Sequence, residues 1–483
     1  TGTVDVTGAT LSVDISDLMS GEVTATDEFI IVSNDDTDAV TGTFNGLAEN
    51  AIVATNLGGT GLVAIIHYGG GDGNDISLEV VGAIFQIVGN DAVYTDLAGL
   101  VNTLTLTRIT DTGKNYVQIS DSSTVLVAGN QTGVEQVSVN SVRIDVAQFS
   151  GDILVNTNAA NDSLTVDYSG SGGLFTKNIS FDGGAPTMGP GDSLTLTGNP
   201  VAFTTVTYAF ANESDGSIDV DSTDGVTINY FNLEPITANI SATNVVLNYS
   251  ATAETITASD AGGGQTLIDS DVAGESLTFT NPTTTLTINA GDTGVNTVDI
   301  GSLAASYSAS IIINGGDAGD TVNLNGAVTF AANRSLTVDA EIINAPNTGS
   351  DIATSGTGSV SLTAARNIVM STGSSISTVN GGITLDANAG GATSGTFTGV
   401  DIVGATVSMS GSGAIDIDGQ GGTTGSSVGV SIRNDSQVVS SSAAGGGTIT
   451  INGTGAGDLA GGYGVFVTGT STLVDSKSGA IQI

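Results

Sequence analysis

The feature that most constrains the fold of this chain is a short apolar motif that recurs at a nearly constant interval in the last third of the sequence. Residues 383–385, 415–417, 449–451 and 481–483 each place two branched apolar side chains around one polar residue, and they are spaced 32, 34 and 32 residues apart. Alternation of this kind is typical of a half-buried β-strand. Recurrence at a fixed interval is typical of a chain that stacks one repeat on the next. The sequence therefore predicts a β-repeat protein in this region.

Two more strands recur within each interval. Residues 428–432 return at residues 463–467, and residues 438–439 are matched by residues 473–474. Three short strands per interval, separated by Gly, Ser and Thr turns, predict a triangular cross-section in which equivalent side chains stack on one another.

A second motif, in which Asp or Asn precedes Ser or Thr and an apolar strand, marks further repeats of the same kind. It occurs at residues 160–166, 190–196, 295–300 and 318–324, and the last two copies repeat at a spacing of 24 residues, measured from Val298 to Val322. A spacing of this size corresponds to one turn of a solenoid.

We therefore expect an all-β fold, a right-handed parallel β-helix (β-solenoid) with about three short strands per rung. The chain is expected to divide into a first β block (1–82), an irregular β region (83–280) and a regular parallel β-helix (281–483) that continues beyond residue 483. A row of β-sandwich domains is the alternative. For residues 83–280 the sequence leaves wide β-helix rungs and a β-sandwich-like portion both open.

The composition agrees with a thin β core. Hydrophobic residues make up 39% of the chain but aromatic residues only 5%, and there are 69 Gly, 6 Pro and no Cys. Collagen would need Gly at every third position with abundant Pro, and a disulfide scaffold would need Cys. Helical and βαβ folds are excluded because the apolar residues alternate and no amphipathic helical segment separates the strands.

The charge excludes several classes of partner. The chain has 49 acidic and 8 basic residues, a formal net charge of −41. Nucleic acids and anionic membranes are bound through clustered Lys and Arg, so neither is expected as a partner. No apolar run approaches the roughly 20 residues of a membrane helix. The first residues carry no secretory signal and already alternate, from which we expect a segment of a longer protein.

Residues 65–81 read as strand, turn and strand, with a Gly/Asp-rich turn between two apolar runs. The stretch resembles the autotransporter-associated β-strand repeat found in large, filamentous-haemagglutinin-like bacterial surface proteins. The matching residues are Tyr68, Gly70, Gly71, Asp72, Gly73, Asn74, Asp75 and Leu78. The resemblance covers roughly the first 80 residues. It implies an extracellular parallel β-helix at the bacterial cell surface and does not imply a ligand.

Acid-rich turns are the candidate metal sites, because Ca²⁺ prefers hard oxygen ligands and neighbouring rungs can bring two turns together. The candidate calcium ligands are Asp35, Asp36, Asp38, Asp72, Asp75, Asp317 and Asp320. The Gly70 to Asp75 turn also fits the first positions of a calcium-binding nonapeptide, but Ser77 stands where that repeat has an apolar residue. A purely structural role of these acids as turn residues is the alternative.

No catalytic residue is predicted. His67 is the single histidine, and the arginines are widely scattered along the chain. We expect a non-enzymatic extracellular structural or adhesive protein, an acidic β-helical stalk, with no cofactor other than Ca²⁺. Its expected partners are other copies of itself, other surface proteins or glycans. A self-assembling filament or S-layer subunit is the alternative, and a polysaccharide-degrading β-helix enzyme is a further one.

Overall fold

The computed structural model describes the chain apart from residues 1–3, 20–21, 25–26, 35–37, 60–61, 98, 130, 185–190, 199–201, 222–224, 250–252, 273–275, 292–293, 317–318, 392, 442–445 and 457–461. The described residues confirm the all-β prediction. They form strands β1 to β42, and the helical elements among them are two 3-10 turns, η1 (Leu57–Gly59) and η2 (Val146–Gln148). No helix of this described part is long and apolar enough to cross a membrane.

The chain folds into two compact units. The first comprises Thr1–Pro200 and Asp224–Asn239, and the second comprises Val201–Thr223 and Ile240–Ile483. The expected domain boundaries near residues 82 and 280 stay predictions.

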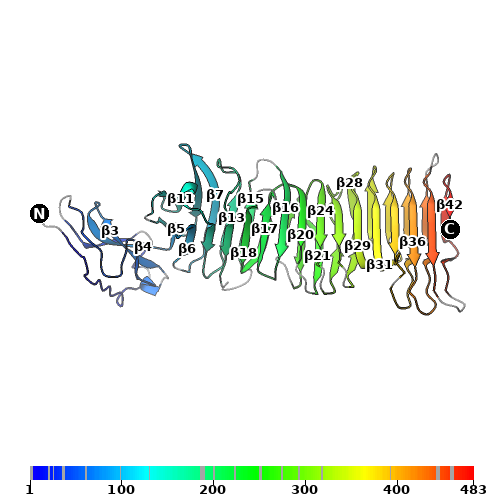
Figure 1. The fold of residues 1–483 in the computed structure, drawn as a ribbon, viewed down its shortest axis with the longest axis horizontal. Coiled ribbons are helices and arrows are strands. Elements are labelled where there is room, and N and C mark those ends of the chain that lie inside the picture. Colours follow the sequence, from blue (N-terminus) through cyan, green and yellow to red (C-terminus); the bar gives the residue numbers. More distant parts are fainter. Residues whose placement is uncertain are drawn as a thin grey trace. The chain divides into compact units, whose positions relative to one another are not determined.

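A four-stranded sheet lies near the beginning of the first unit (Figure 1). Its spatial order is β1 (Glu28–Val32), β4 (Asp75–Val81), β3 (Val63–Gly70) and β2 (Ile52–Ala54). All three pairs are antiparallel, although the resemblance of this stretch implies parallel strands. For β3 and β4 the reason is local, because the turn between them is too short for the crossover that parallel neighbours need.

The rest of the first unit is built from parallel ladders with hairpins inserted between them. One ladder joins β6 (Asp91–Asp96), β12 (Ile153–Asn156), β14 (Ile179–Asp182) and β18 (Thr227–Phe231). A second joins β7 (Thr103–Asp111), β13 (Ser163–Asp167), β15 (Asp192–Thr197) and β19 (Leu233–Ala238). The hairpins are antiparallel and pair β7 with β8 (Lys114–Asp121) and β10 (Val134–Ser138) with β11 (Ser141–Asp145).

The second unit begins with antiparallel pairs, of β16 (Phe203–Phe210) with β17 (Gly216–Val220) and of β22 (Gln265–Ser270) with β21 (Thr255–Gly262) and β23 (Leu277–Thr280). The later strands form parallel columns in which each strand pairs with its equivalent in the next repeat (Figure 1). The first column contains β24 (Thr285–Asn289), β26 (Ser310–Asn314), β29 (Leu336–Ala345), β31 (Val360–Met370), β33 (Ile383–Ala387), β36 (Ile415–Gln420), β39 (Ile449–Thr454) and β42 (Ile481–Gln482). The second column contains the end of β31, β34 (Val400–Val403), β37 (Val430–Arg433) and β40 (Val465–Thr468).

The third column is a separate six-stranded sheet. It contains β28 (Val328–Ala332), β30 (Asp351–Ser355), β32 (Ser375–Thr378), β35 (Thr406–Met409), β38 (Gln437–Ser440) and β41 (Leu473–Ser476). Each late repeat thus supplies one strand to each of three columns.

The register agrees with the spacing of the sequence at most positions. Ile383, Ile415, Ile449 and Ile481 pair in succession, as the intervals predict. One predicted match is wrong by a single residue, because Val438 pairs with Val474 and not with residue 473. The corner before β41 is one residue longer than the corner before β38, and the buried Val438 requires an inward-facing partner.

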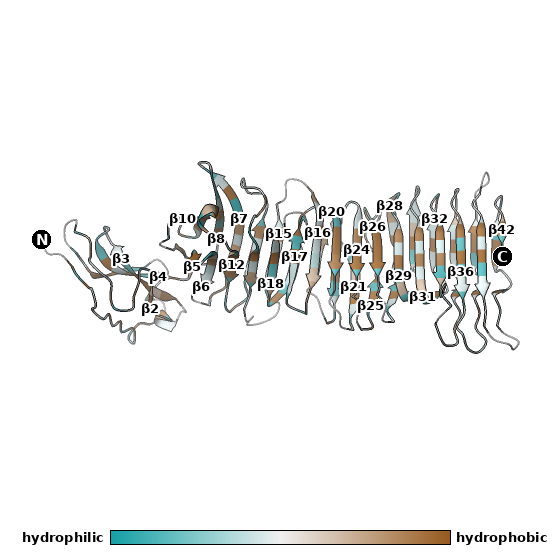
Figure 2. Ribbon diagram, viewed as in Figure 1, coloured by the Kyte–Doolittle hydropathy of each residue, from teal (hydrophilic) through white to brown (hydrophobic). Residues whose placement is uncertain are grey.

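The core of the late repeats consists mainly of Ile, Val and Leu side chains, whereas earlier strands also bury aromatic rings such as Tyr208, Phe279 and Tyr307. Apolar residues alternate with polar ones along the strands of the second unit, which Figure 2 shows as alternating brown and paler segments. The inward-facing Ile383, Ile415 and Ile449 are 0% exposed, whereas Asp416, which lies between inward residues of β36, faces solvent. The alternating apolar and polar residues of the sequence therefore correspond to the inward and outward faces of the folded strands.

Candidate functional site

The candidate calcium ligands do not form one cluster in the described part of the chain. Asp75 is buried, and its Oδ1 accepts a hydrogen bond from the backbone N–H of Asn34 at 2.7 Å. Asp38 and Asp72 are exposed residues of the first unit, and Asp320 belongs to the second unit. The remaining candidates, Asp35, Asp36 and Asp317, lie outside the described residues.

Within the described residues, no three His, Asp or Glu side chains converge in a way that could hold a metal ion. In the described structure Asp75 and Asp320 accept hydrogen bonds from backbone N–H groups, whereas Asp38 and Asp72 face solvent. Calcium binding by the acid-rich turns as a whole stays a prediction.

His67 on β3 lies between two glutamates. Its Nδ1 lies 2.8 Å from Glu49 Oε1, and its Nε2 lies 2.7 Å from Glu79 Oε2 on β4. Glu49 is fixed in turn, because its Oε2 accepts from the backbone N–H of Tyr68 at 2.9 Å. An imidazole donates from both nitrogens only when it is protonated. The hydrogen bond to Glu79 accordingly raises the pKa of His67 to about 8, and the ring acts as a charged link between strands.

The Asp or Asn of the recurring motif links neighbouring repeats of the chain. In the first unit the backbone N–H of Asn102 donates to Asp162 Oδ1, and the N–H of Asp162 donates to Asp192 Oδ1, both at 2.6 Å. These three side chains are at most 2% exposed. A buried side-chain oxygen thus satisfies a backbone N–H just before each strand, where no ladder partner is available.

The second unit repeats this arrangement. The backbone N–H of Glu254 donates to Asn296 Oδ1 at 3.1 Å, and the N–H of Asn296 donates to Asp320 Oδ1 at 2.6 Å. Asn296 and Asp320 are 0% exposed. Asp320, one of the candidate calcium ligands, therefore serves in the described structure as a backbone acceptor.

The ionised forms of two of these buried carboxylates are unfavourable. Burial raises the pKa of Asp162 to about 6 and also raises the pKa of Asp192. The Oδ2 atoms of both have no hydrogen-bond partner among the described residues. An ionised, half-satisfied carboxylate in the interior lowers the stability of the fold.

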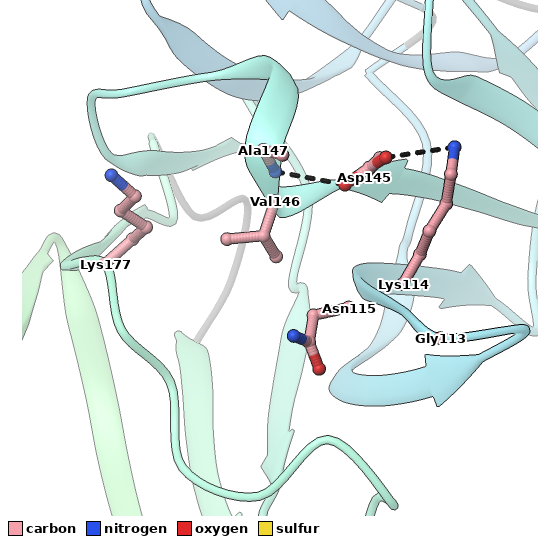
Figure 3. Close-up of a pocket in the computed structure, with 7 residues that line it drawn as sticks. All are labelled: Gly113, Lys114, Asn115, Asp145, Val146, Ala147 and Lys177. Atoms are coloured by element: carbon pink, nitrogen blue, oxygen red, sulfur yellow. Dashed lines mark hydrogen bonds and ion pairs between the residues drawn. The ribbon is translucent and has the colours of Figure 1, made fainter.

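A pocket of about 480 Å³ opens beside the β7–β8 and β10–β11 hairpins of the first unit (Figure 3). It lies where the β7–β8 turn meets the end of β11, η2 and the segment before β14. The lining residues are Gly113, Lys114, Asn115, Asp145, Val146, Ala147 and Lys177.

The charged side chains of the pocket are fixed by specific contacts. Lys114 Nζ lies 3.1 Å from Asp145 Oδ2, and Asp145 Oδ1 accepts from the backbone N–H of Ala147 at 3.0 Å. The hydrogen bond to Asp145 raises the pKa of Lys114. On the other side of Val146 (Figure 3), Lys177 Nζ donates to the carbonyl oxygen of Ser150 at 2.9 Å. The pocket is therefore lined by two lysines and one aspartate that come from three segments of the chain.

Neither lysine stands out in the sequence, and no motif joins them. The available signal is that Arg108, Lys114, Arg143 and Lys177, half of the eight basic residues, fall between positions 108 and 177. Arg143 is neutralised beside the pocket by Asp111 and Glu135, at 2.8 and 2.7 Å.

Comparison with known proteins yields no relative. No family model, no curated protein and no solved structure matches this chain.

Proposed function

We propose that this chain is a non-enzymatic extracellular structural and adhesive protein of the bacterial cell surface. In this proposal its body is a right-handed parallel β-helix with three short strands per rung. The stacked rungs serve as an acidic stalk that holds surface loops away from the cell, as the resemblance of residues 65–81 to an autotransporter-associated repeat implies.

The observation that carries the proposal is the register of the parallel columns in the second unit. Ile383 pairs with Ile415, and Ile415 with Ile449, in one column, while Val400 pairs with Val430 in the next. Each added turn buries the same side chains against the same kind of neighbour, so the chain gains length without a new packing problem. A stalk needs that property.

Amide ladders on the same unit support the proposal. Asn289 Nδ2 donates to Asn248 Oδ1, and Asn314 Nδ2 donates to Asn289 Oδ1, both at 2.7 Å. A second ladder runs from Asn344 through Asn323 to Asp299, at 2.9 and 2.7 Å. Stacked amides of this kind satisfy one another along the direction of stacking, and they tie neighbouring turns together outside the core.

Electron microscopy of the purified 483-residue chain, with and without a calcium chelator, tests the proposal. We expect isolated thin rods whose appearance does not change with the chelator. Ordered fibres or sheets that come apart when calcium is removed would replace the stalk by the alternative, a self-assembling filament or S-layer subunit. Release of reducing or unsaturated sugar ends from an acidic polysaccharide would overturn the non-enzymatic assignment.

A further inference from the structure

The pocket beside the β7–β8 and β10–β11 hairpins of the first unit is not required by a stalk, yet it is lined by two lysines and a single acid on a strongly acidic chain. Two of its seven lining residues are lysines, Lys114 and Lys177, in a chain with 8 basic and 49 acidic residues. We propose that this pocket binds a small hydroxylated carboxylate, namely a uronic-acid sugar. The inference does not depend on the stalk function, because the site lies within the first unit alone.

Lys177 supplies the group that would hold the carboxylate. In the described part of the chain it forms no ion pair, and its Nζ donates to the carbonyl oxygen of Ser150 at 2.9 Å and lies 5.9 Å from the ring centroid of Phe149. An ammonium group carries three N–H donors. One is used by Ser150, so the others are available to an anionic oxygen in the pocket.

Lys114 and Asp145 supply a donor and an acceptor side by side. The Lys114 side chain is 52% exposed, whereas that of Asp145 is only 7% exposed and is fixed by its hydrogen bond to Ala147. Each carboxylate oxygen can accept two hydrogen bonds. Asp145 therefore keeps capacity for a ligand hydroxyl while it holds Lys114 at the rim of the pocket.

Asn115, Val146 and Ala147 complete the lining. The Oδ1 of Asn115 accepts from Thr110 Oγ1 at 2.8 Å, which orients the amide and leaves its NH₂ group as a donor. Val146 and Ala147 add an apolar surface suited to the C–H face of a sugar ring.

The ligand class follows from these groups taken together. The volume of about 480 Å³ lies in the usual range of small-molecule sites and suits a mono- or disaccharide. A ligand that uses the whole lining needs a carboxylate for Lys177 and hydroxyls for Asp145 and Asn115. A neutral sugar lacks the charge, and inorganic phosphate lacks the row of hydroxyls.

Calorimetric titration of the full chain with digalacturonic acid tests the inference, with a neutral digalactose and inorganic phosphate as parallel probes. We expect saturable binding of the acidic disaccharide and clearly weaker binding of both other probes. Lys177→Gln should weaken binding of the acidic disaccharide about tenfold or more, the usual effect of losing a hydrogen bond to a charged group. Lys177→Arg should retain most of the affinity, because it retains the charge.

Lys477→Gln is the matched control, since it removes the same charge from an exposed turn of the second unit. It should leave the affinity unchanged, and circular dichroism should confirm that both Gln variants are folded. The inference is overturned if the wild-type chain shows no saturable binding, or if both Gln variants lose affinity equally. It is also overturned if phosphate or the neutral sugar binds as tightly as the acidic disaccharide.

Discussion

The protonation of His67 should control the stability of the four-stranded sheet in the first unit. Three carboxylates face this ring: Glu49 and Glu79 contact its two nitrogens, and Glu28 on β1 interacts with it electrostatically. The pKa of His67 is raised from 6.5 to about 8, first by the hydrogen bond to Glu79, although burial acts against this. The folded-state pKa therefore lies above the unfolded one. The charged link then contributes its full stability below about pH 6.5 and loses it as the pH rises through about 8.

The size of the effect follows from the shift. A difference between about 8 and 6.5 corresponds to roughly 2 kcal/mol at about 1.4 kcal/mol per pKa unit. Solvent screening reduces this value, because the His67 side chain is 20% exposed and its glutamates are 29% and 30% exposed. We expect His67→Gln to lower the unfolding free energy of this sheet by about 1 kcal/mol at pH 6, and to have little effect at pH 9, where the wild-type ring is neutral.

Nuclear magnetic resonance can test this directly, because the chain has one histidine and hence one set of imidazole signals. A pH titration of those signals should give a midpoint near 8. Glu79→Gln should lower the midpoint more than Glu49→Gln, since the bond to Glu79 makes the larger contribution. A wild-type midpoint at or below 6.5, or an unchanged midpoint in Glu79→Gln, would refute the proposal that the two glutamates stabilise the protonated ring.

Three further predictions concern the core and the corners, and denaturant or thermal unfolding measures each. Asp162→Asn keeps the oxygen that accepts from the neighbouring turn but removes a buried charge whose pKa is raised to about 6. The variant should be at least as stable as wild type at pH 7, and it should lack the gain in stability that wild type shows as the pH falls from about 6 to 4; an undiminished gain would contradict this. Ile415→Ala should cost about 2 to 5 kcal/mol, because a fully buried side chain leaves a cavity. The outward-facing Asp416→Ala should change stability by no more than about 0.5 kcal/mol, and equal effects would contradict the assignment of inside and outside. Gly316→Ala should be strongly destabilising, because φ is +92° and the new Cβ would meet a carbonyl oxygen of the preceding turn at 2.3 Å. Gly263→Ala, at φ +63° in open space, should cost only about 1 to 2 kcal/mol, and equal losses would show that the close approach is unimportant.

The sequence predicted the strands of the late repeats, from residue 383 on, well because each repeat identifies the equivalent positions of the next. The spacing of Ile383, Ile415 and Ile449 gave their pairing, and alternation gave their burial. The error at Val438 and Val474 arose at a corner between strands, where the periodic spacing of the apolar residues does not reveal an extra residue. In the irregular region, local sequence indicated strands and turns. It did not indicate which strands pair in parallel, because no constant spacing links the partners: Ile153 and Ile179 lie 26 residues apart, and Leu164 and Leu194 lie 30 apart.

The sequence by itself determined that this protein is built from short alternating strands that bury one apolar face, since burial on one face of a strand requires a period of two. The sequence also identified the recurring Asp-containing motif, but not its structural role. Only the tertiary structure showed that the side chain of Asp192 accepts from the backbone of Asp162, because this bond joins residues 30 positions apart. The pocket is likewise a product of folding. Lys114, Asp145 and Lys177 come from the start of one strand, the end of another and a connecting segment, and nothing in their local sequence brings them together.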